Sequence, residues 1–529
     1  MTSPHPDLAI WSAAVNAALL GTSRAPLRVE AADGSLGAAC TAVAGDEPEP
    51  SATLLRVAAA ATVYRRCGRM AALSDEPPPA VCPPDTRPMC PPAAAALLRR
   101  IMNGEHASLI GEWLTLAARH GVRAPADALR DLLDLARREP KLRPLVLSVG
   151  GARAEWLAGQ NAEWSFATAG SSPDALAATF ETGTGPARLA ALQQLRALDA
   201  ERARTMLEAS WAQDAPADRA AFAAALVTGL SLADEPFLER ALDDRRKEVR
   251  QAAASLLARL PASALVARMT ARAREFVTLG RSGLLKRLRV DVTLPETADA
   301  ALVRDGVDAK PPAGIGERAW WLAQILAAVP PVTWTSPGSV DAEALLRATE
   351  GHEWREPLVA GWLTATERHR DATWAAALWR NARVATVDGK WGAPSPARVF
   401  TSVVPADGVD VELRQSIGAS RDALRGGHAA LIAMLEWPNE WSDALARTVA
   451  HRLKEYAAAG VPLGGEYGLH ALLGRSAHAA PVSAASAFTD GWPEQSDTWQ
   501  TWAPAVDAVA SALRFRSDLH LAFNEESSS

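Results

Sequence analysis

The stretch LERALDDRRKEVRQAAASLLARLP, residues 238–261, decides the fold class of this chain. From Val249 to Leu260 its apolar residues recur at the three- and four-residue spacing of one helix face. Asp243 and Asp244 precede this face and are suited to cap a helix, because a carboxylate accepts hydrogen bonds from the unpaired amides at an N-terminus. Pro261 ends the pattern because proline lacks the amide donor that a helix needs. The stretch therefore predicts two helices joined by a short turn.

The same pattern recurs with a spacing of 31 residues between positions 187 and 275. Each of three apolar segments begins at an arginine and is followed by a break and a second apolar helix. Repeated helical hairpins of this kind are typical of an α-solenoid, in which stacked neighbours share one core. We therefore predict an all-α fold built from irregular helical hairpins, with flanking helical domains and at most a short strand or two. The equivalent positions are Arg188, Arg219 and Arg250, then Leu195, Leu226 and Leu257, and then Leu207, Leu238 and Met269.

The pattern D-x-x-x-x-V-R-x-x-A, carried by Asp244, Val249, Arg250 and Ala253, resembles a HEAT repeat. This resemblance implies that Asp and Arg side chains link adjacent hairpins in a hydrogen-bonded ladder. The period is shorter than the HEAT length of about 40 residues. The resemblance is therefore to HEAT-like packing and not to a regular array.

Composition shifts along the chain predict four segments. We expect an N-terminal helical domain over 1–150, a HEAT-like repeat region over 151–290, a loop or linker over 291–316, and a tryptophan-rich helical domain over 317–529. Alternation of Val290 with polar neighbours predicts one short strand close to the second boundary. The chain has 18 Trp against 9 Phe and 3 Tyr. Tryptophans at helical spacing pack between helices more often than they line a binding groove, and both uses are open here.

Charge and cysteine content limit the class of protein. The formal net charge is -6, and hydrophobic residues make up 48% of the chain, as expected of a globular protein with a buried core. The start of the chain has no basic segment before its apolar stretch, and no uninterrupted apolar run is long enough for a membrane span. The four cysteines lie within the first 90 residues without a C-x2-C pair, so zinc is disfavoured and free thiols are expected. We expect a cytoplasmic protein.

Five blocks spread over the first 340 residues resemble the bacterial domain-of-unknown-function family 5691. The resemblance implies a HEAT-like helical protein of the bacterial cytoplasm, and its gene neighbours suggest a MoxR-type AAA+ ATPase or a von Willebrand A-domain protein as partner. It supplies no catalytic residues to transfer. The blocks are ALLGTSRAPL (18–27), GEWLTLAARHG (111–121), GGARAEWLAGQNAEW (150–164), DEPFLERALDDRRKEVRQAAASLLARLP (234–261) and ERAWWLAQILAAVPPVTW (317–334).

The strongest local charge lies in 245–289, which has twelve basic residues against two acids. These side chains either form solvated helix faces and inter-repeat ladders, or present a basic surface to an acidic protein or, less favoured, to nucleic acid. An overall pI near 6.0 weighs against nucleic acid. The predicted interaction surface consists of Arg245, Arg246, Lys247, Arg250, Arg281, Lys286, Arg287 and Arg289.

No nucleotide-binding loop, nucleophile elbow or zinc-protease motif is present in the sequence. We therefore predict a protein that is not an enzyme and has no catalytic residues, no cofactor and no metal. The leading hypothesis is a helical-repeat scaffold or adaptor that binds a partner protein. The alternative is a small-molecule enzyme or ligand sensor with its site in the tryptophan-rich half, and a third reading is nucleic-acid binding through 245–289.

Overall fold

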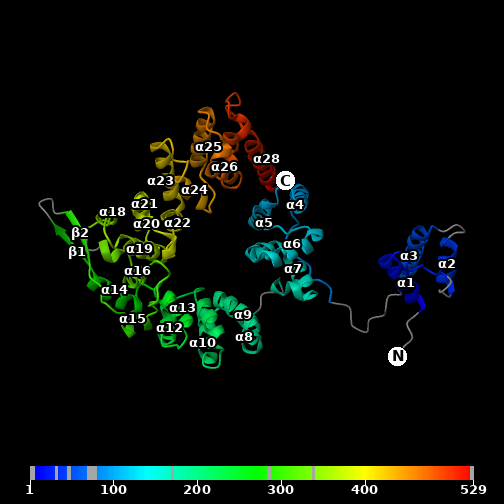
Figure 1. Ribbon diagram of the computed structural model, residues 1–529, viewed down its shortest axis with the longest axis horizontal. Coiled ribbons are helices and arrows are strands. Elements are labelled where there is room, and N and C mark those ends of the chain that lie inside the picture. The colour runs from blue at the N-terminus through cyan, green and yellow to red at the C-terminus, as the bar shows by residue number, and fades with distance from the viewer. Residues whose placement is uncertain are drawn as a thin grey trace. The chain divides into compact units, whose positions relative to one another are not determined.

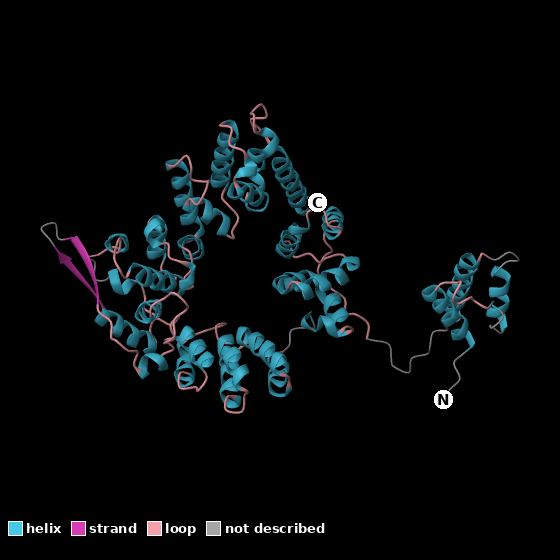
Figure 2. Ribbon diagram, viewed as in Figure 1, coloured by secondary structure: helices cyan, strands magenta, loops and turns pink. Residues whose placement is uncertain are grey.

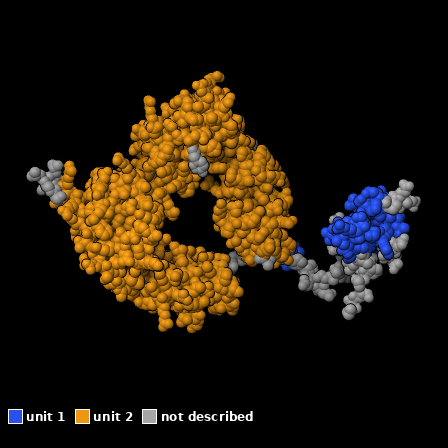
Figure 3. All heavy atoms as spheres, in the orientation of Figure 1, with its two compact units in different colours: residues 1–81 blue, residues 82–529 orange. Residues whose placement is uncertain are grey.

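The structure of the chain is a computed structural model. It describes residues 6–29, 34–44, 49–67, 80–167, 172–282, 287–335 and 340–524. The chain forms two compact units, Met1–Val81 and Cys82–Ser529, which Figure 3 shows in different colours. This division differs from the four predicted segments, because it falls inside 1–150 and leaves 151–529 within one unit.

Unit 1 is a small helical unit made of α1 (Pro6–Leu20), α2 (Gly34–Ala44) and α3 (Pro50–Cys67). Its core is formed by Ile10, Leu36, Cys40 and Val57, which are almost completely buried. Burial raises the pKa of the Cys40 thiol, because an apolar environment disfavours the thiolate.

Unit 2 consists almost entirely of helices (Figure 2). Its first helices are α4 (Pro92–Met102), α5 (Ile110–Arg119), α6 (Leu129–Arg138), α7 (Arg143–Gly159), α8 (Pro173–Thr182), α9 (Gly185–Leu198), α10 (Ala200–Ser210), α11 (Pro216–Ala225), α12 (Glu235–Ala241), α13 (Lys247–Leu257) and α14 (Ala264–Phe276). Two strands follow, β1 (Val277–Ser282) and β2 (Arg287–Val292). The remaining helices are α15 (Ala300–Arg304), α16 (Glu317–Ala327), α17 (Val332–Thr335), α18 (Ala342–Ala348), α19 (Arg355–His369), α20 (Ala372–Arg380), α21 (Ala382–Ala385), α22 (Pro396–Val403), α23 (Ala406–Ala419), α24 (Ala429–Glu436), α25 (Asp443–Ala458), α26 (Tyr467–Ala479), α27 (Ala485–Thr489) and α28 (Trp499–Asn524).

The predicted all-α class is confirmed. The strands β1 and β2 form one antiparallel pair, in which Val277 lies opposite Val292. The strand predicted at Val290 is β2, and its partner β1 has no comparable alternation in the sequence.

The helices of unit 2 stack in two series (Figure 1). The inner series borders the central opening of unit 2 and comprises α9, α11, α13, α16, α19, α22, α24, α26 and α28. The outer series contains α8, α10, α12, α18, α20, α23, α25 and α27. Figure 3 shows that the opening persists when all heavy atoms are drawn. Stacked hairpins bury a continuous core between the two series, as expected of an α-solenoid.

The arginines of the 31-residue period form part of the implied ladder. Arg188 on α9 pairs with Asp214 at 2.6 Å, and Arg219 on α11 pairs with Asp244 at 3.2 Å. In both cases the arginine of one hairpin reaches the aspartate that precedes the next inner helix. The third arginine, Arg250, instead donates to the backbone carbonyls of Asp244 and Arg245. Two of the three arginines therefore link adjacent hairpins through an aspartate.

Most tryptophans of the C-terminal half belong to the core. Trp362 and Trp374 are almost fully buried, and their ring centroids lie 5.5 Å apart. Trp379 stacks on Phe400 at 4.3 Å. Large flat rings fill the space between the helix series, so packing accounts for most of this unusual composition.

The last helix of unit 2 packs against its first helices. Phe515, Leu519 and Phe523 on α28 share a core with residues of α4 and α5, and the rings of Trp113 and Phe523 lie 5.6 Å apart. We call this contact the closure. Residues about 400 positions apart thereby join the two ends of unit 2.

One buried ion pair accompanies the apolar contacts of the closure. Arg516 and His520 on α28 both contact Glu112 on α5, each at 2.7 Å. Burial raises the pKa of Glu112, but the hydrogen bonds from His520 and Arg516 outweigh it and bring the pKa below its ordinary value.

Within the described residues, no helix has the length and apolar character that crossing a membrane requires.

Candidate functional site

A cavity of about 300 Å³ opens among three helices of the inner series. Its walls come from α13, α14, α16 and α19, together with the turn after α15 and the turn at Trp391. We call it the inner pocket. It lies where the regular stacking is interrupted, because α14, β1, β2 and α15 intervene between α13 and α16.

Small side chains create the space of the inner pocket. Ala254 and Ala258 line it from α13, Ala323 and Ala327 from α16, and Ala360 from α19. Larger side chains at these positions would fill the volume, as they do elsewhere in the core.

A glycine lets the rim of the pocket approach α13 closely. Gly306 has a φ of 87°, and a Cβ at this position would lie 2.3 Å from the Cβ of Ala254. Only glycine tolerates both the left-handed backbone and this short distance.

The strongest polar group of the pocket is the guanidinium of Arg368 on α19. It donates one hydrogen bond, to the carbonyl of Ala327 at 2.7 Å. Among the described residues no carboxylate forms an ion pair with it. Burial and the like charge of Arg259 lower the pKa of Arg368 to about 10, although Glu367 opposes the shift. Glu367 itself is bonded to Arg398 at 2.9 Å.

A second cation, Arg259, follows the end of α13. It is exposed, and it makes no ion pair with any residue in the part of the chain that the structure describes. Arg259 does not line the inner pocket, but its like charge contributes to the lowered pKa of Arg368.

Further polar groups of the pocket lack partners among the described residues. The buried Nε1–H of Trp320 has no acceptor. Gln251 and Ser255 line the pocket from α13 and make no side-chain hydrogen bond to a described residue. By contrast, Gln324 is engaged with the backbone of Asp308 and Trp320. The unused donors therefore lie mainly on the α13, Trp320 and Arg368 sides.

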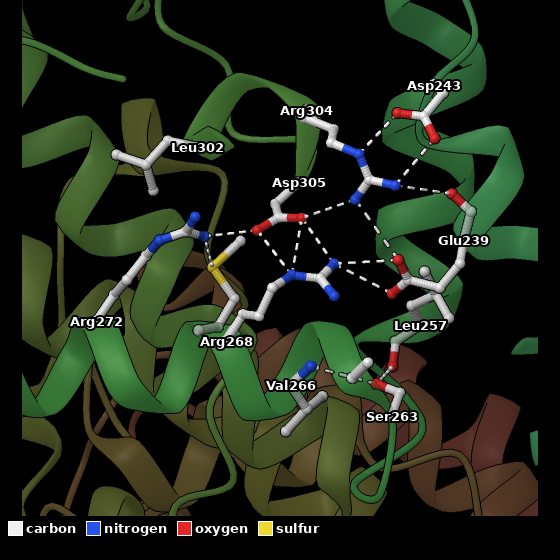
Figure 4. A network of polar contacts seen from close by, with 12 residues as sticks. Glu239, Asp243, Leu257, Ser263, Val266, Arg268, Arg272, Leu302, Arg304 and Asp305 are labelled. Atoms are coloured by element: carbon white, nitrogen blue, oxygen red, sulfur yellow. Dashed lines mark hydrogen bonds and ion pairs between the residues drawn. The ribbon is translucent and has the colours of Figure 1, made fainter. Parts of the chain in front are cut away.

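A fully paired charge network forms the wall beyond Gly306 (Figure 4). The buried carboxylate of Asp305 contacts Arg268 at 2.7 Å, Arg272 at 2.6 Å and Arg304 at 3.6 Å. Arg268 also reaches Glu239 at 3.1 Å. We call this the Asp305 network, and it ties α12, α14 and α15 together.

The predicted interaction surface falls into two separate places. One group lies at the start of α13, where Lys247 pairs with Asp308 at 2.6 Å while Arg245 and Arg246 are exposed without an ion pair to a described residue. The other group lies on the strand pair, where Arg289 contacts Asp291. The residues of the first group are Arg245, Arg246, Lys247 and Arg250; those of the second are Arg281, Arg287 and Arg289, while Lys286 lies outside the described residues.

Sequence reasoning did not connect Arg259 with Arg368, the cation of the inner pocket. Arg259 was counted in the basic stretch but not in the predicted surface, and Arg368 lies more than a hundred residues further along. No local motif connects them, because their proximity comes from the stacking of α13 and α19 around α16.

A second cavity, of about 460 Å³, lies beside the closure. It is lined by His106, His470 and His478 among others, but His106 contacts Ser511 and His478 contacts Ser108. Within the described residues, no group of three or more metal-ligating side chains is placed to hold a metal ion. Its polar groups are thus more fully used than those of the inner pocket.

Comparison with known proteins adds one finding. A model of a family described as "Family of unknown function (DUF5691)" matches residues 13–523, which is nearly the whole chain. The match confirms the resemblance drawn from the five sequence blocks. No curated protein and no solved structure matches the chain.

Proposed function

Since the chain belongs to DUF5691, a family of unknown function, we propose its role from its own geometry: it is a helical-repeat scaffold that binds a segment of a partner protein at the inner pocket. The single observation that carries the proposal is the inner pocket, which presents an arginine that forms no ion pair with a described residue, beside several alanines. Concave surfaces of stacked helical hairpins are suited to extended partner segments.

Two features support a protein segment as the ligand. The pocket opens on the inner series, where neighbouring helices continue the surface on both sides. Its volume suits one side chain, so a polypeptide anchored there has the rest of the inner series available for further contacts. A MoxR-type AAA+ ATPase and a von Willebrand A-domain protein are the partners to test first, because the family resemblance suggests them.

Site-specific photo-crosslinking in the native cell tests this proposal. A photoreactive amino acid replaces Ser255, an exposed residue of the pocket, and in a matched control it replaces Gln415, an exposed residue of the outer helix α23. We expect one discrete crosslinked protein from position 255 and none from position 415. Equal products from both positions, or none from position 255, would contradict the proposal.

The predicted basic surface enters the same experiment as a second variant. Changing Arg245, Arg246 and Lys247 together to glutamate reverses the charge at the start of α13. A loss of the crosslink from position 255 would extend the binding surface to these residues, and an unchanged yield would restrict it to the inner pocket.

A second candidate function is a sensor of a small ligand. It is favoured by the size of the pocket and by the presence of Trp320 and Trp391 in its wall, which belong to the tryptophan-rich half. A small molecule that copurifies with the protein and is released on denaturation, together with no crosslink from position 255, would favour this alternative.

A further inference from the structure

We infer that the inner pocket is a seat for a carboxylate of the bound partner segment, held by Arg368. The inference rests on the proposed function and names the chemistry that the pocket recognises.

Comparison with two buried arginines shows that Arg368 lacks an ion-pair partner among the described residues. Arg196 is fully buried and pairs with Asp234 at 3.0 Å, and Arg516 is nearly buried and pairs with Glu112. Removing a charge from water without pairing it is costly, so buried arginines are normally matched by an acid from the same fold. Arg368 has only a carbonyl acceptor among the described residues. A ligand carboxylate would complete its environment.

The unused donors fit a carboxylate with a short apolar stem. A guanidinium presents two parallel N–H groups that match the two oxygens of a carboxylate. The Nε1–H of Trp320 and the side chains of Gln251 and Ser255 offer further donors on the same lining. The alanine side chains of the wall can contact methylene groups of the ligand. They offer no partner for a second charge on the ligand.

Saturation-transfer NMR on the full-length protein tests the charge requirement with two defined probes. The first is 4-phenylbutyrate and the second is its neutral amide, 4-phenylbutyramide, both in a buffer low in chloride. We expect the carboxylate to bind at least tenfold more tightly than the amide. Arg368→Gln should weaken carboxylate binding at least tenfold and leave amide binding unchanged. Equal binding of the two probes, or carboxylate binding that is unaffected by Arg368→Gln, would overturn the inference.

A second variant guards against a loss of folding. Thr364 lines the pocket one helical turn before Arg368, so Thr364→Glu supplies an internal carboxylate at favourable i, i+4 spacing. We expect this variant to melt at a temperature no lower than that of the unaltered protein and to lose at least tenfold in carboxylate affinity. A variant that keeps the melting temperature and still binds the carboxylate normally would overturn the inference.

Inorganic phosphate provides the competing chemistry. Acetyl-glutamate amide serves as the reference competitor, because it carries the carboxylate of a protein side chain. We expect phosphate to displace 4-phenylbutyrate only at concentrations at least tenfold higher than this reference requires. If phosphate displaces the probe more effectively, the pocket selects phosphate and the inference is wrong.

The two proposals fail in different ways. A crosslink from position 255 that persists in Arg368→Gln, combined with equal probe binding, retains the scaffold and removes the carboxylate seat. Arg368-dependent carboxylate binding without any crosslink retains the seat and removes a partner protein as the source of the carboxylate.

Discussion

The Asp305 network and the inner pocket are neighbours with opposite charge arrangements. In the network, one buried carboxylate is shared by three arginines from two helices. In the pocket, Arg368 forms no ion pair with a described residue, and its burial lowers its pKa. Every charged group of the network has an ion-pair partner within the fold. In the pocket, the guanidinium of Arg368 and the Nε1–H of Trp320 have donors without such partners among the described residues.

This difference separates structural arginines from available ones. Arginines matched by an acid of the same fold hold helices together, and removing either partner leaves a charge stranded in the protein. An arginine such as Arg368, which is half-buried and forms no ion pair with a described residue, contributes little to folding and is free to contact a ligand. Natural proteins tolerate such a destabilising feature where a binding site requires it.

Asp305→Asn should have the largest effect on stability. It removes the charge that three arginines share, so we expect the free energy of unfolding to fall by about 3 kcal/mol. Urea denaturation followed by circular dichroism measures the change. Asp243→Asn is the matched control, because Asp243 pairs with Arg304 but is largely exposed, and it should cost less than about 1 kcal/mol. Equal losses in the two variants would contradict the assignment of Asp305 as the centre of the network.

A pair of arginine variants compares the two regions directly. Arg272→Met removes an ion pair to Asp305 and should lower the free energy of unfolding by about 2 kcal/mol. Arg368→Met loses one hydrogen bond to a carbonyl but also relieves a desolvated charge, so the change should stay below about 1 kcal/mol. The same denaturation experiment measures both. A larger loss from Arg368→Met than from Arg272→Met would show that Arg368 is structural.

The closure offers a case in which the acid can be titrated. The pKa of Glu112 lies below its ordinary value, so Glu112 stabilises the fold above about pH 4.3 and this contribution is lost as the pH falls through the lowered pKa. Arg516 and His520 are the titratable groups that contact its carboxylate. We expect Glu112→Gln to lower stability at pH 7 by about 1 kcal/mol and to reduce the loss of stability between pH 5 and 3, measured by denaturation across pH. An unchanged acid profile in Glu112→Gln would contradict this role.

The smallest effect should come from the exposed arginines at the start of α13. Arg245→Glu and Arg246→Glu alter charges that are unpaired but solvated, so each should change the free energy of unfolding by less than about 0.5 kcal/mol. Thermal unfolding of the two variants measures this. A loss well above that value would place these side chains in a structural contact and not on a free surface.

The helical repeat could be predicted from the sequence because its cause is local. The 31-residue spacing of Arg188, Arg219 and Arg250 marks the three inner helices α9, α11 and α13. Asp244 lies only a few residues before the start of α13 at Lys247. Apolar spacing, caps and prolines act within a few turns, so a single chain reveals them.

The net charge of the basic stretch 245–289 could not be predicted from the sequence, because the acids that pair with its basic residues lie outside this stretch. The acids that neutralise part of 245–289 are Asp305 and Asp308, beyond its end, and Glu239, before its start. Counting basic residues therefore overestimated the free charge at Lys247, Arg268 and Arg272. The closure was missed for the same reason, since Glu112 and Arg516 lie 404 positions apart in the sequence.

The most direct test of the central claim is the yield of the crosslink from position 255 in the unaltered protein and in Thr364→Glu. If the inner pocket seats a carboxylate of the partner, the internal glutamate competes for Arg368, and we expect the yield to fall at least fivefold while the melting temperature is maintained. An undiminished yield in the folded variant would show that the partner does not place a carboxylate on Arg368, and it would contradict the account.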